Sequence, residues 1–189
     1  MILVLEIIGL EHHLCINNMN NKNKKISKIL DKYKSSFSSN DQSSLDELLS
    51  SDLDSAKYSL FTDGACEFDN EYKPINAGIG GVIKLKDKNI FSFSENVGVK
   101  TNNEAEYLAL IKGINLCLEN NISNISIFAD SELVVRQING DYKVKNERMA
   151  VLHKKTHELL SKLNSWDINH VLRDKNTEAD DLSKQGLSK

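Results

Sequence analysis

Long apolar runs are missing from this chain. None of its hydrophobic stretches reaches the ~20 residues that a membrane-spanning helix needs. The apolar residues 1–10 have no basic start, and no small-residue cleavage site follows them, which argues against a secretory signal. We therefore expect a cytoplasmic protein that makes no contact with a membrane.

Cysteine is scarce, and the spacings typical of zinc ligands are absent. The three cysteines, Cys15, Cys66 and Cys117, are odd in number and widely scattered. This pattern argues against a disulfide framework and suits a reducing compartment. No set of His and Cys residues has the spacing of a zinc site. His153 and His157 share a helix face at i, i+4 and could hold a metal, but a solvated face is the simpler interpretation.

Basic charge is not in excess. The chain has 24 basic and 27 acidic residues and a formal charge of −3. A protein that binds nucleic acid through a basic surface is usually positively charged. An acidic site would still be able to bind phosphate groups through the cations that it recruits. The glycine-rich residues 77–83 are not followed by the Gly-Lys-Ser/Thr of a phosphate loop, and indicate close backbone approach in a strand.

A length of 189 residues suits one domain with an extension. Residues 1–56 are rich in Asn, Lys and Ser, as in Asn-Lys-Asn-Lys-Lys at 21–25. Such a low-complexity stretch buries too little apolar surface to offset chain entropy, so we expect it to be largely disordered. Residues 57–189 form the predicted folded domain.

Alternating apolar patterns predict strands and helices within that domain. The expected strands are 58–66, 77–85, 89–97, 124–130 and 166–172, and the expected helices start near 101, 131, 149 and 177, with the third running to Leu163. The helix that follows Thr101 is the best signalled, because Thr101 and Glu104 have the form of a capping box. This order indicates an α/β fold, a mixed sheet with helices on its faces.

Four acidic residues in four separate motifs are the strongest functional signal. They are Asp63, Glu106, Asp130 and Asp180, each expected at the end of a strand or on a helix beside it. Carboxylates that gather in this way repel one another unless a cation lies between them. Two-metal phosphodiester cleavage needs oxygen ligands that hold ions roughly 3.5–4 Å apart.

Taken singly, each acid has an ordinary explanation. Asp63 could be a turn residue before a glycine, and Glu106 a solvated helix residue. Asp130 could belong to a helix cap, and Asp180 could favour a helix N-terminus. It is improbable that four acids with only these ordinary roles would occur together in this order and in these sequence contexts.

The motifs resemble those of the type 1 ribonuclease H family across residues 57–189. The matching segments, in the order of that family, are Tyr-Ser-Leu-Phe-Thr-Asp-Gly-Ala (58–65), Ala-Gly-Ile-Gly-Gly-Val-Ile (77–83), Thr-Asn-Asn-Glu-Ala-Glu-Tyr (101–107), Ala-Asp-Ser-Glu-Leu-Val-Val (129–135) and Asn-Thr-Glu-Ala-Asp-Asp-Leu-Ser (176–183). The resemblance implies a ribonuclease H-like, five-stranded mixed sheet, three antiparallel strands followed by two parallel ones, flanked by helices.

The resemblance also implies an activity. It is hydrolysis of the RNA strand of RNA–DNA hybrids by a monomeric endoribonuclease, which leaves 5′-phosphate and 3′-hydroxyl ends and uses two Mg²⁺ ions, with Mn²⁺ as a substitute. Asp63 and Asp180 would hold the ion that activates water, and Asp63, Glu106 and Asp130 the ion at the leaving group. The Ala-Asp-x-Leu motif of the family identifies Asp180, rather than Asp181, as the fourth carboxylate ligand.

Family likeness extends to contacts with the substrate. Asn102 and Asn103 would read the 2′-hydroxyl of RNA, and Thr101 and Asn146 would hold a phosphate of the DNA strand. Gly64 and Ser131 are further candidates for substrate contacts.

The chain departs from many family members in two places. The short link 140–146 replaces a basic protrusion, and the loop before the last helix has no histidine, so Arg173 is the candidate for its role in product release.

Two other functions stay open on the same fold. One is a non-catalytic module that binds hybrids or other nucleic acids, since function does not follow from fold alone. The other is a DNA nuclease of related fold, such as an integrase or a junction resolvase. The Thr-Asn-Asn segment and the spacing of the last carboxylate argue against the DNA nuclease.

Overall fold

The computed structural model describes residues 58–189, and the predicted disordered extension 1–56 lies outside them. The strands are β1 (Tyr58–Phe68), β2 (Pro74–Leu85), β3 (Lys88–Gly98), β4 (Asn124–Ala129) and β5 (Ser165–His170). The helices are α4 (Asn102–Glu119), α5 (Glu132–Ile138), α6 (Glu147–Leu160) and α7 (Thr177–Leu187), with a 3₁₀ turn, η2 (Arg173–Lys175), before α7. Among these residues no helix is both long and apolar enough to cross a membrane.

The strands form one five-stranded mixed sheet in the order β3-β2-β1-β4-β5. β1 pairs antiparallel with β2, and β2 with β3, whereas β4 is parallel to both β1 and β5. This arrangement confirms the predicted fold class. In the parallel pair, Thr62 of β1 lies opposite Ala129 of β4. Asp130 therefore leaves the sheet after β4 beside Asp63, which lies within β1 and pairs with Gly80 of β2.

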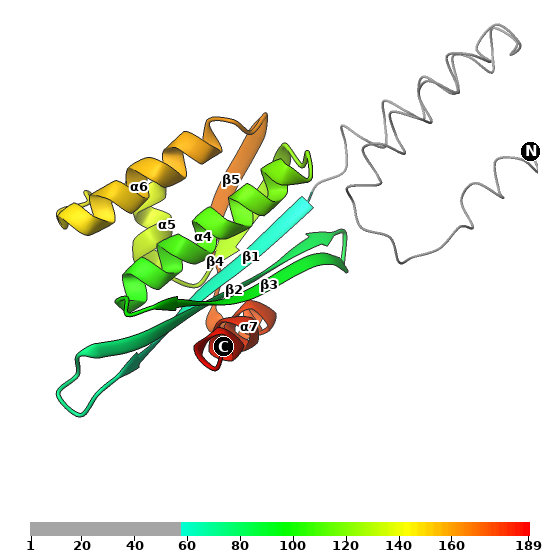
Figure 1. The fold of residues 1–189 in the computed structure, drawn as a ribbon. Coiled ribbons are helices and arrows are strands. Elements are labelled where there is room, and N and C mark those ends of the chain that lie inside the picture. The colour runs from blue at the N-terminus through cyan, green and yellow to red at the C-terminus, as the bar shows by residue number, and fades with distance from the viewer. Residues whose placement is uncertain (1–57) are drawn as a thin grey trace, which may run out of the picture. The chain divides into compact units, whose positions relative to one another are not determined.

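Helices cover both faces of the sheet. Figure 1 shows α4, α5 and α6 together on one face and α7 alone on the other. The main core lies under the first three helices, where Leu60, Tyr107, Ile114 and Ile127 are fully buried. Burial of side chains this large is the main source of the stability of the domain.

α4 begins where the sequence predicts. The Thr101 side chain accepts a hydrogen bond from the Glu104 backbone N–H, and the Glu104 carboxylate accepts one from the Thr101 backbone N–H at 2.9 Å. This capping box satisfies donors that the first helical turn leaves free. It also sets the start of the helix that carries Glu106.

Glycines in β2 let α7 lie directly on the sheet. A Cβ at Gly78 or Gly80 would meet backbone atoms of α7 between Ala179 and Leu187. The absence of a side chain therefore allows the close approach that the glycine-rich strand predicts. This contact positions the helix that carries Asp180.

The structure corrects two predicted boundaries. α6 ends at Leu160, not at Leu163, because the chain turns there and the Leu163 N–H donates to the Leu160 carbonyl at 3.1 Å. Leu163 is still buried, so its apolar side chain extended the helical pattern beyond the end of the helix. β5 ends at His170, and Leu172 is exposed before η2.

Candidate active site beside β1 and the end of β4

Three of the four predicted carboxylates meet where β4 ends beside the middle of β1, so Asp63 lies within its strand and not at the expected strand end. Asp63 comes from β1, Glu106 from the second turn of α4, and Asp130 from the end of β4. One carboxylate oxygen of each lies within 4.8 Å of the others. Asp63 and Glu106 are only 3% and 6% exposed, so bulk water does little to screen their charges.

Burial and mutual repulsion shift the acids toward their neutral forms. The pKa of Asp63 is raised from 3.8 to about 6, chiefly by burial and then by the charges of Asp130 and Asp180, against a hydrogen bond from Ser183. The pKa of Glu106 is raised by burial and by the charges of Asp63 and Asp130. The ionised cluster is therefore unfavourable unless it is compensated by a proton or a cation.

The donor set fits a hard divalent ion. All three ligand side chains offer carboxylate oxygens, which Mg²⁺ and Ca²⁺ prefer, and none offers the sulfur or imidazole typical of zinc sites. Glu106 Oε2 is buried and has no hydrogen-bond partner. A bound cation would satisfy this oxygen, whereas an unpaired buried acceptor is costly.

Asp180 lies on α7 beside this group but is engaged differently. It is 8% exposed, whereas Asp181 is exposed to solvent. Its Oδ1 accepts a hydrogen bond from Arg173 Nη2 at 2.8 Å, and its Oδ2 accepts one from Lys184 Nζ. Burial raises the pKa of Asp180, but the bonds and charges of Lys184 and Arg173 outweigh it, and the net pKa is lowered.

Two residues near the acids were missed by the sequence reasoning. The Ser183 hydroxyl contacts both Asp63 Oδ2 and the Asp180 carbonyl, and so connects β1 with α7. Lys184 lies one helical turn after Asp180, and this i, i+4 spacing is a signal that sequence reasoning can use. No sequence signal indicates the Ser183 contact, which depends on how α7 lies on β1.

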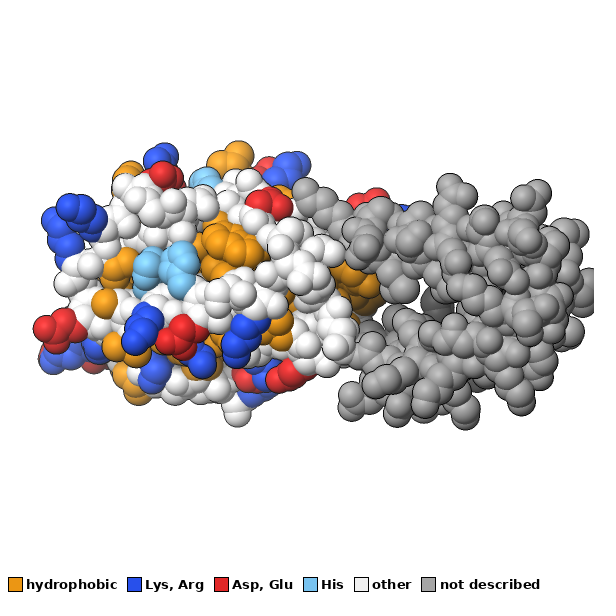
Figure 2. All heavy atoms as spheres, turned by 90° about the horizontal axis from the view of Figure 1, so that it is seen from above, with side chains coloured by type: hydrophobic (Ala, Val, Ile, Leu, Met, Phe, Trp, Pro, Cys, Tyr) orange, Lys and Arg blue, Asp and Glu red, His pale blue; other side chains and the backbone are white. Residues whose placement is uncertain are grey.

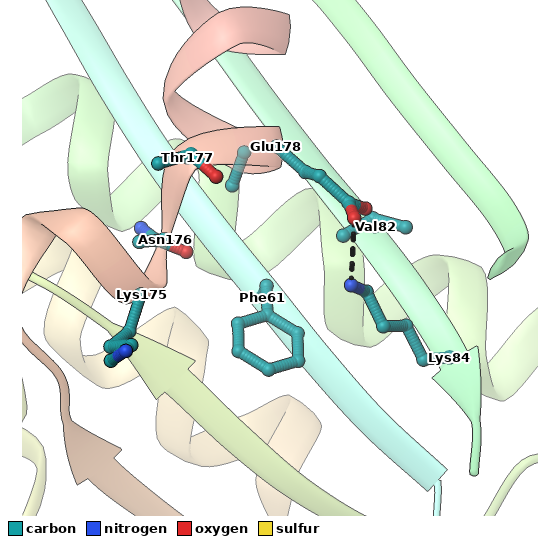
Figure 3. Close-up of a pocket in the computed structure, with 8 residues that line it drawn as sticks. Phe61, Val82, Lys84, Lys175, Asn176, Thr177 and Glu178 are labelled. Atoms are coloured by element: carbon teal, nitrogen blue, oxygen red, sulfur yellow. Dashed lines mark hydrogen bonds and ion pairs between the residues drawn. The ribbon is translucent and has the colours of Figure 1, made fainter. Parts of the chain in front are cut away.

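Asn176 joins the base of α7 to β1. Its side-chain amide donates to the carbonyl of Thr62, the residue before Asp63, at 2.9 Å. Figure 3 shows Asn176 beside Phe61 in a shallow pocket on the α7 face, where Lys84 and Glu178 form an ion pair of 2.9 Å. The residues that line this pocket include none of the four acids.

The predicted substrate-contacting residues surround the start of α4 and α6. Asn102 and Asn103 are exposed in the first turn of α4. Thr101 and Asn146 both act as N-caps, and Asn146 Oδ1 accepts hydrogen bonds from the backbone N–H groups of residues 148 and 149. Glu104 accepts a bond from the Thr101 hydroxyl at 2.7 Å and lies 3.6 Å from Arg148, an ion pair that bridges the two helix starts.

The remaining predicted residues lie nearer to the carboxylates. Gly64 follows Asp63 and packs against the backbone of residues 105 and 106. Ser131 follows Asp130, is half-buried, and makes no capping hydrogen bond with its side chain at the start of α5. Arg173 lies in η2 and contacts Asp180 rather than standing free in solvent.

The histidine pair on α6 is partly exposed, and its rings also contact neighbouring groups. His153 and His157 are half-buried, and their Nε2 atoms are 3.2 Å apart. His153 Nε2 also lies 3.1 Å from the Gln137 carbonyl, and Trp166 packs edge-on to His157. Figure 2 shows pale-blue histidine side chains at the surface, next to an apolar patch. Among residues 58–189, the three-carboxylate group is the only set of three His, Cys, Asp or Glu side chains close enough together to hold a metal ion.

This sheet and its acidic end define a ribonuclease H-like domain. Residues 61–186 match the family model described as reverse transcriptase-like. The chain therefore belongs to this ribonuclease H-like family.

Relatives of known name lie in the same family. The chain is 31% identical over 115 residues to ribonuclease HI of Halobacterium salinarum, which covers 60% of this chain and 58% of that protein. It is also 31% identical over 116 residues to the bifunctional protein Rv2228c of Mycobacterium tuberculosis, across 60% of this chain and 32% of that protein. The match thus spans less than two thirds of these curated relatives.

Solved structures share the fold. RNase H1 of Halobacterium salinarum NRC-1 has a TM-score of 0.66 at 28% identity and covers 70% of this chain and 98% of its own. LC11-RNase H1, solved in complex with an RNA/DNA hybrid, has a TM-score of 0.63 at 31% identity and covers 69% of this chain and 96% of its own.

Proposed function

We propose that this protein is a divalent-metal-dependent endoribonuclease that cuts the RNA strand of RNA–DNA hybrids. The observation that carries the proposal is the buried group of Asp63, Glu106 and Asp130, with ligand oxygens within 4.8 Å of one another. The likeness to LC11-RNase H1, a protein crystallised with such a hybrid, supports this substrate class.

Each acid has a role in this proposal. Asp63, Glu106 and Asp130 hold a divalent ion, which we take to be Mg²⁺ with Mn²⁺ as a substitute, and Asp180 contributes to a second. When bound, such ions supply the positive charge that activates water and stabilises the leaving oxygen. The products are a 5′-phosphate and a 3′-hydroxyl.

Residues around the acids would orient the hybrid. The exposed amides of Asn102 and Asn103 are free to read the 2′-hydroxyl that distinguishes RNA from DNA. Thr101 and Asn146, which cap the starts of α4 and α6, would hold a phosphate of the DNA strand.

Gly64 and Ser131 extend this contact zone, because they directly follow Asp63 and Asp130. The link 139–146 between α5 and α6 contains no helix or strand, so this domain offers no basic protrusion there. Binding of the hybrid then depends on the residues around the acids and on the ions in the acidic site. We place the activity in residues 57–189 of a monomer. A fragment with this range should therefore keep the cleavage rate of the full chain.

The experiment is cleavage of an end-labelled hybrid in the presence of Mg²⁺. Asp63→Asn and Asp180→Asn should abolish cutting, while the circular dichroism spectrum stays unchanged. Asp181→Asn is the matched control, because this neighbour makes the same chemical change at an exposed position. Full activity of Asp63→Asn would disprove the assigned role.

Substrate comparison separates this proposal from its alternatives. Duplex DNA, duplex RNA and the hybrid are offered at equal concentration with either Mg²⁺ or Mn²⁺. Selective cutting of the hybrid supports the proposal. Binding without cutting would indicate a non-catalytic module, and preferential cutting of duplex DNA would indicate a DNA nuclease.

A further inference from the structure

Both carboxylate oxygens of Asp180 are engaged by cationic side chains. Arg173 Nη2 donates to Oδ1 at 2.8 Å, and Arg173 Nε lies 3.3 Å from the same oxygen. Lys184 Nζ donates to Oδ2. The Asp180 side chain is 12% exposed, whereas those of Arg173 and Lys184 are 73% and 56% exposed, so the two cations approach from the solvent side.

This pairing sets Asp180 apart from the other acids. The Ser183 hydroxyl contacts both Asp63 Oδ2 and the carbonyl of Asp180, which places Asp180 beside the three-carboxylate group. Yet the group that could hold an ion consists of Asp63, Glu106 and Asp130 alone. The difference is physical, because the three grouped acids lack a cationic side-chain partner within the described residues, whereas Asp180 has two.

Lys184 is the better placed of the two cations to stand in for a metal ion. It lies on α7 at i+4 from Asp180, so the helix keeps its ammonium group within reach of the carboxylate. An ammonium is a compact point charge on a flexible stem, whereas the guanidinium of Arg173 is planar and spreads its charge. The Lys184 side chain is 56% exposed, so its ammonium can move into solvent when a divalent ion takes its place at Asp180.

We propose, given the proposed function, that Lys184 is a built-in competitor for the second divalent ion. While it contacts Asp180, the three-carboxylate group binds one ion tightly. A second ion can bind the Asp180 carboxylate only by displacing Lys184. Lys184 is thus a positioning residue that weakens binding of the second ion in the absence of nucleic acid.

The test is titration of the full-length protein with Mn²⁺ by isothermal calorimetry, without nucleic acid. Lys184→Met removes the charge and keeps the length of the side chain. It should tighten the weaker Mn²⁺-binding event by about two- to fivefold, the change expected when a competing ion pair with one exposed partner is removed. Lys184→Arg keeps the charge and should bind like the wild type. Lys154→Met makes the same change in net charge at an exposed site on α6 and should also leave both events unchanged.

A double variant separates competition at Asp180 from a general effect of charge. In an Asp180→Asn background, Lys184→Met should no longer tighten the weaker event. If Lys184→Met binds Mn²⁺ no more tightly than Lys154→Met, while Asp63→Asn still removes the tight event, this inference is wrong and the proposed function stands. If Asp63→Asn leaves both binding events intact, the proposed function fails and the inference fails with it.

Discussion

The hydroxyl of Ser183 on α7 contacts Oδ2 of Asp63 on β1, although 120 residues separate them in the chain. The same hydroxyl lies 2.8 Å from the carbonyl oxygen of Asp180. A serine has one proton to donate, so it can serve only one of these acceptors while Asp63 is ionised. When Asp63 is protonated, it can donate to Ser183, which then donates to Asp180.

Ser183→Ala should therefore destabilise the protein. Ser183 is fully buried, and its removal leaves Asp63 without its hydroxyl partner, which should cost about 1–3 kcal/mol of unfolding free energy. Urea denaturation at neutral pH measures this change. Ser188→Ala at the exposed end of α7 is the control and should stay within about 0.5 kcal/mol of the wild type. Equal effects at both serines would contradict the role of the buried contact.

The contribution of Asp63 to metal-free stability should fall as the pH rises from about 4 to 7. The folded-state pKa of Asp63, about 6, lies above its ordinary value of 3.8, so the folded protein binds this proton more tightly than the unfolded chain does. The resulting stabilisation is complete below pH 3.8 and is lost as the pH rises through about 6. Asp63 alone accounts for a loss on the order of 3 kcal/mol, and Glu106 contributes with the same sign.

Thermal unfolding in EDTA across this pH range measures the effect. Asp63→Asn removes the titrating group and should flatten this part of the profile, and excess Mg²⁺ should raise the unfolding temperature most at neutral pH. Acids whose pKa is lowered, such as Asp180, change the stability in the opposite direction as the pH rises. The quantity to compare is therefore the difference in unfolding temperature between the wild type and Asp63→Asn at each pH. A difference that does not vary with pH would contradict the assigned pKa.

The start of α4 gives a third prediction. Thr101→Ala removes the capping side chain and should cost about 1 kcal/mol of unfolding free energy, whereas Thr101→Ser keeps the hydroxyl and most of the stability. Denaturant unfolding of the two variants provides the comparison. If alanine and serine are equally stable at this position, the hydroxyl does not contribute to the cap.

Local patterns were enough to predict this helix start and most of the fold. The capping box involves residues three positions apart, a short-range feature that local patterns predict well. The parallel pairing of β1 with β4 joins distant segments and was expected only from the family resemblance. The end of α6 was mispredicted because Leu163 continues the apolar repeat from a turn and still reaches the core.

The inner contacts of the site could not be predicted in the same way. Asp63, Glu106 and Asp130 were identified by their motifs, and the structure brings them together. The Ser183 contact depends on the placement of α7 on glycines of β2, a tertiary relationship that no local pattern encodes. The Lys184 contact was within reach of spacing rules, but a lysine at i+4 from an acid is common on helix surfaces and does not by itself indicate a site.

Gly64 gives a fourth prediction. A Cβ at this position would collide with backbone atoms of residues 105 and 106 in α4, so Gly64→Ala should push the helix that carries Glu106 away from Asp63. We expect a loss of roughly 3 kcal/mol in stability, together with weaker Mn²⁺ binding in calorimetry. The double variant Gly64→Ala/Ala105→Gly should not recover, because the backbone clash remains. Full recovery would show that only the Ala105 side chain is in the way.

Arg173 gives the last prediction, because its proposed role is in product release. Its guanidinium binds Asp180 from the exposed side at 2.8 Å and can exchange this contact for a departing phosphate. Arg173→Ala should lower steady-state turnover of the hybrid by about tenfold, the worth of roughly one charge-assisted hydrogen bond, while single-turnover cleavage changes much less. Arg173→Lys keeps the charge but loses the planar guanidinium. Its steady-state turnover should lie between that of the wild type and that of Arg173→Ala. Equal losses under single- and multiple-turnover conditions would place Arg173 in the cleavage step itself and not in release.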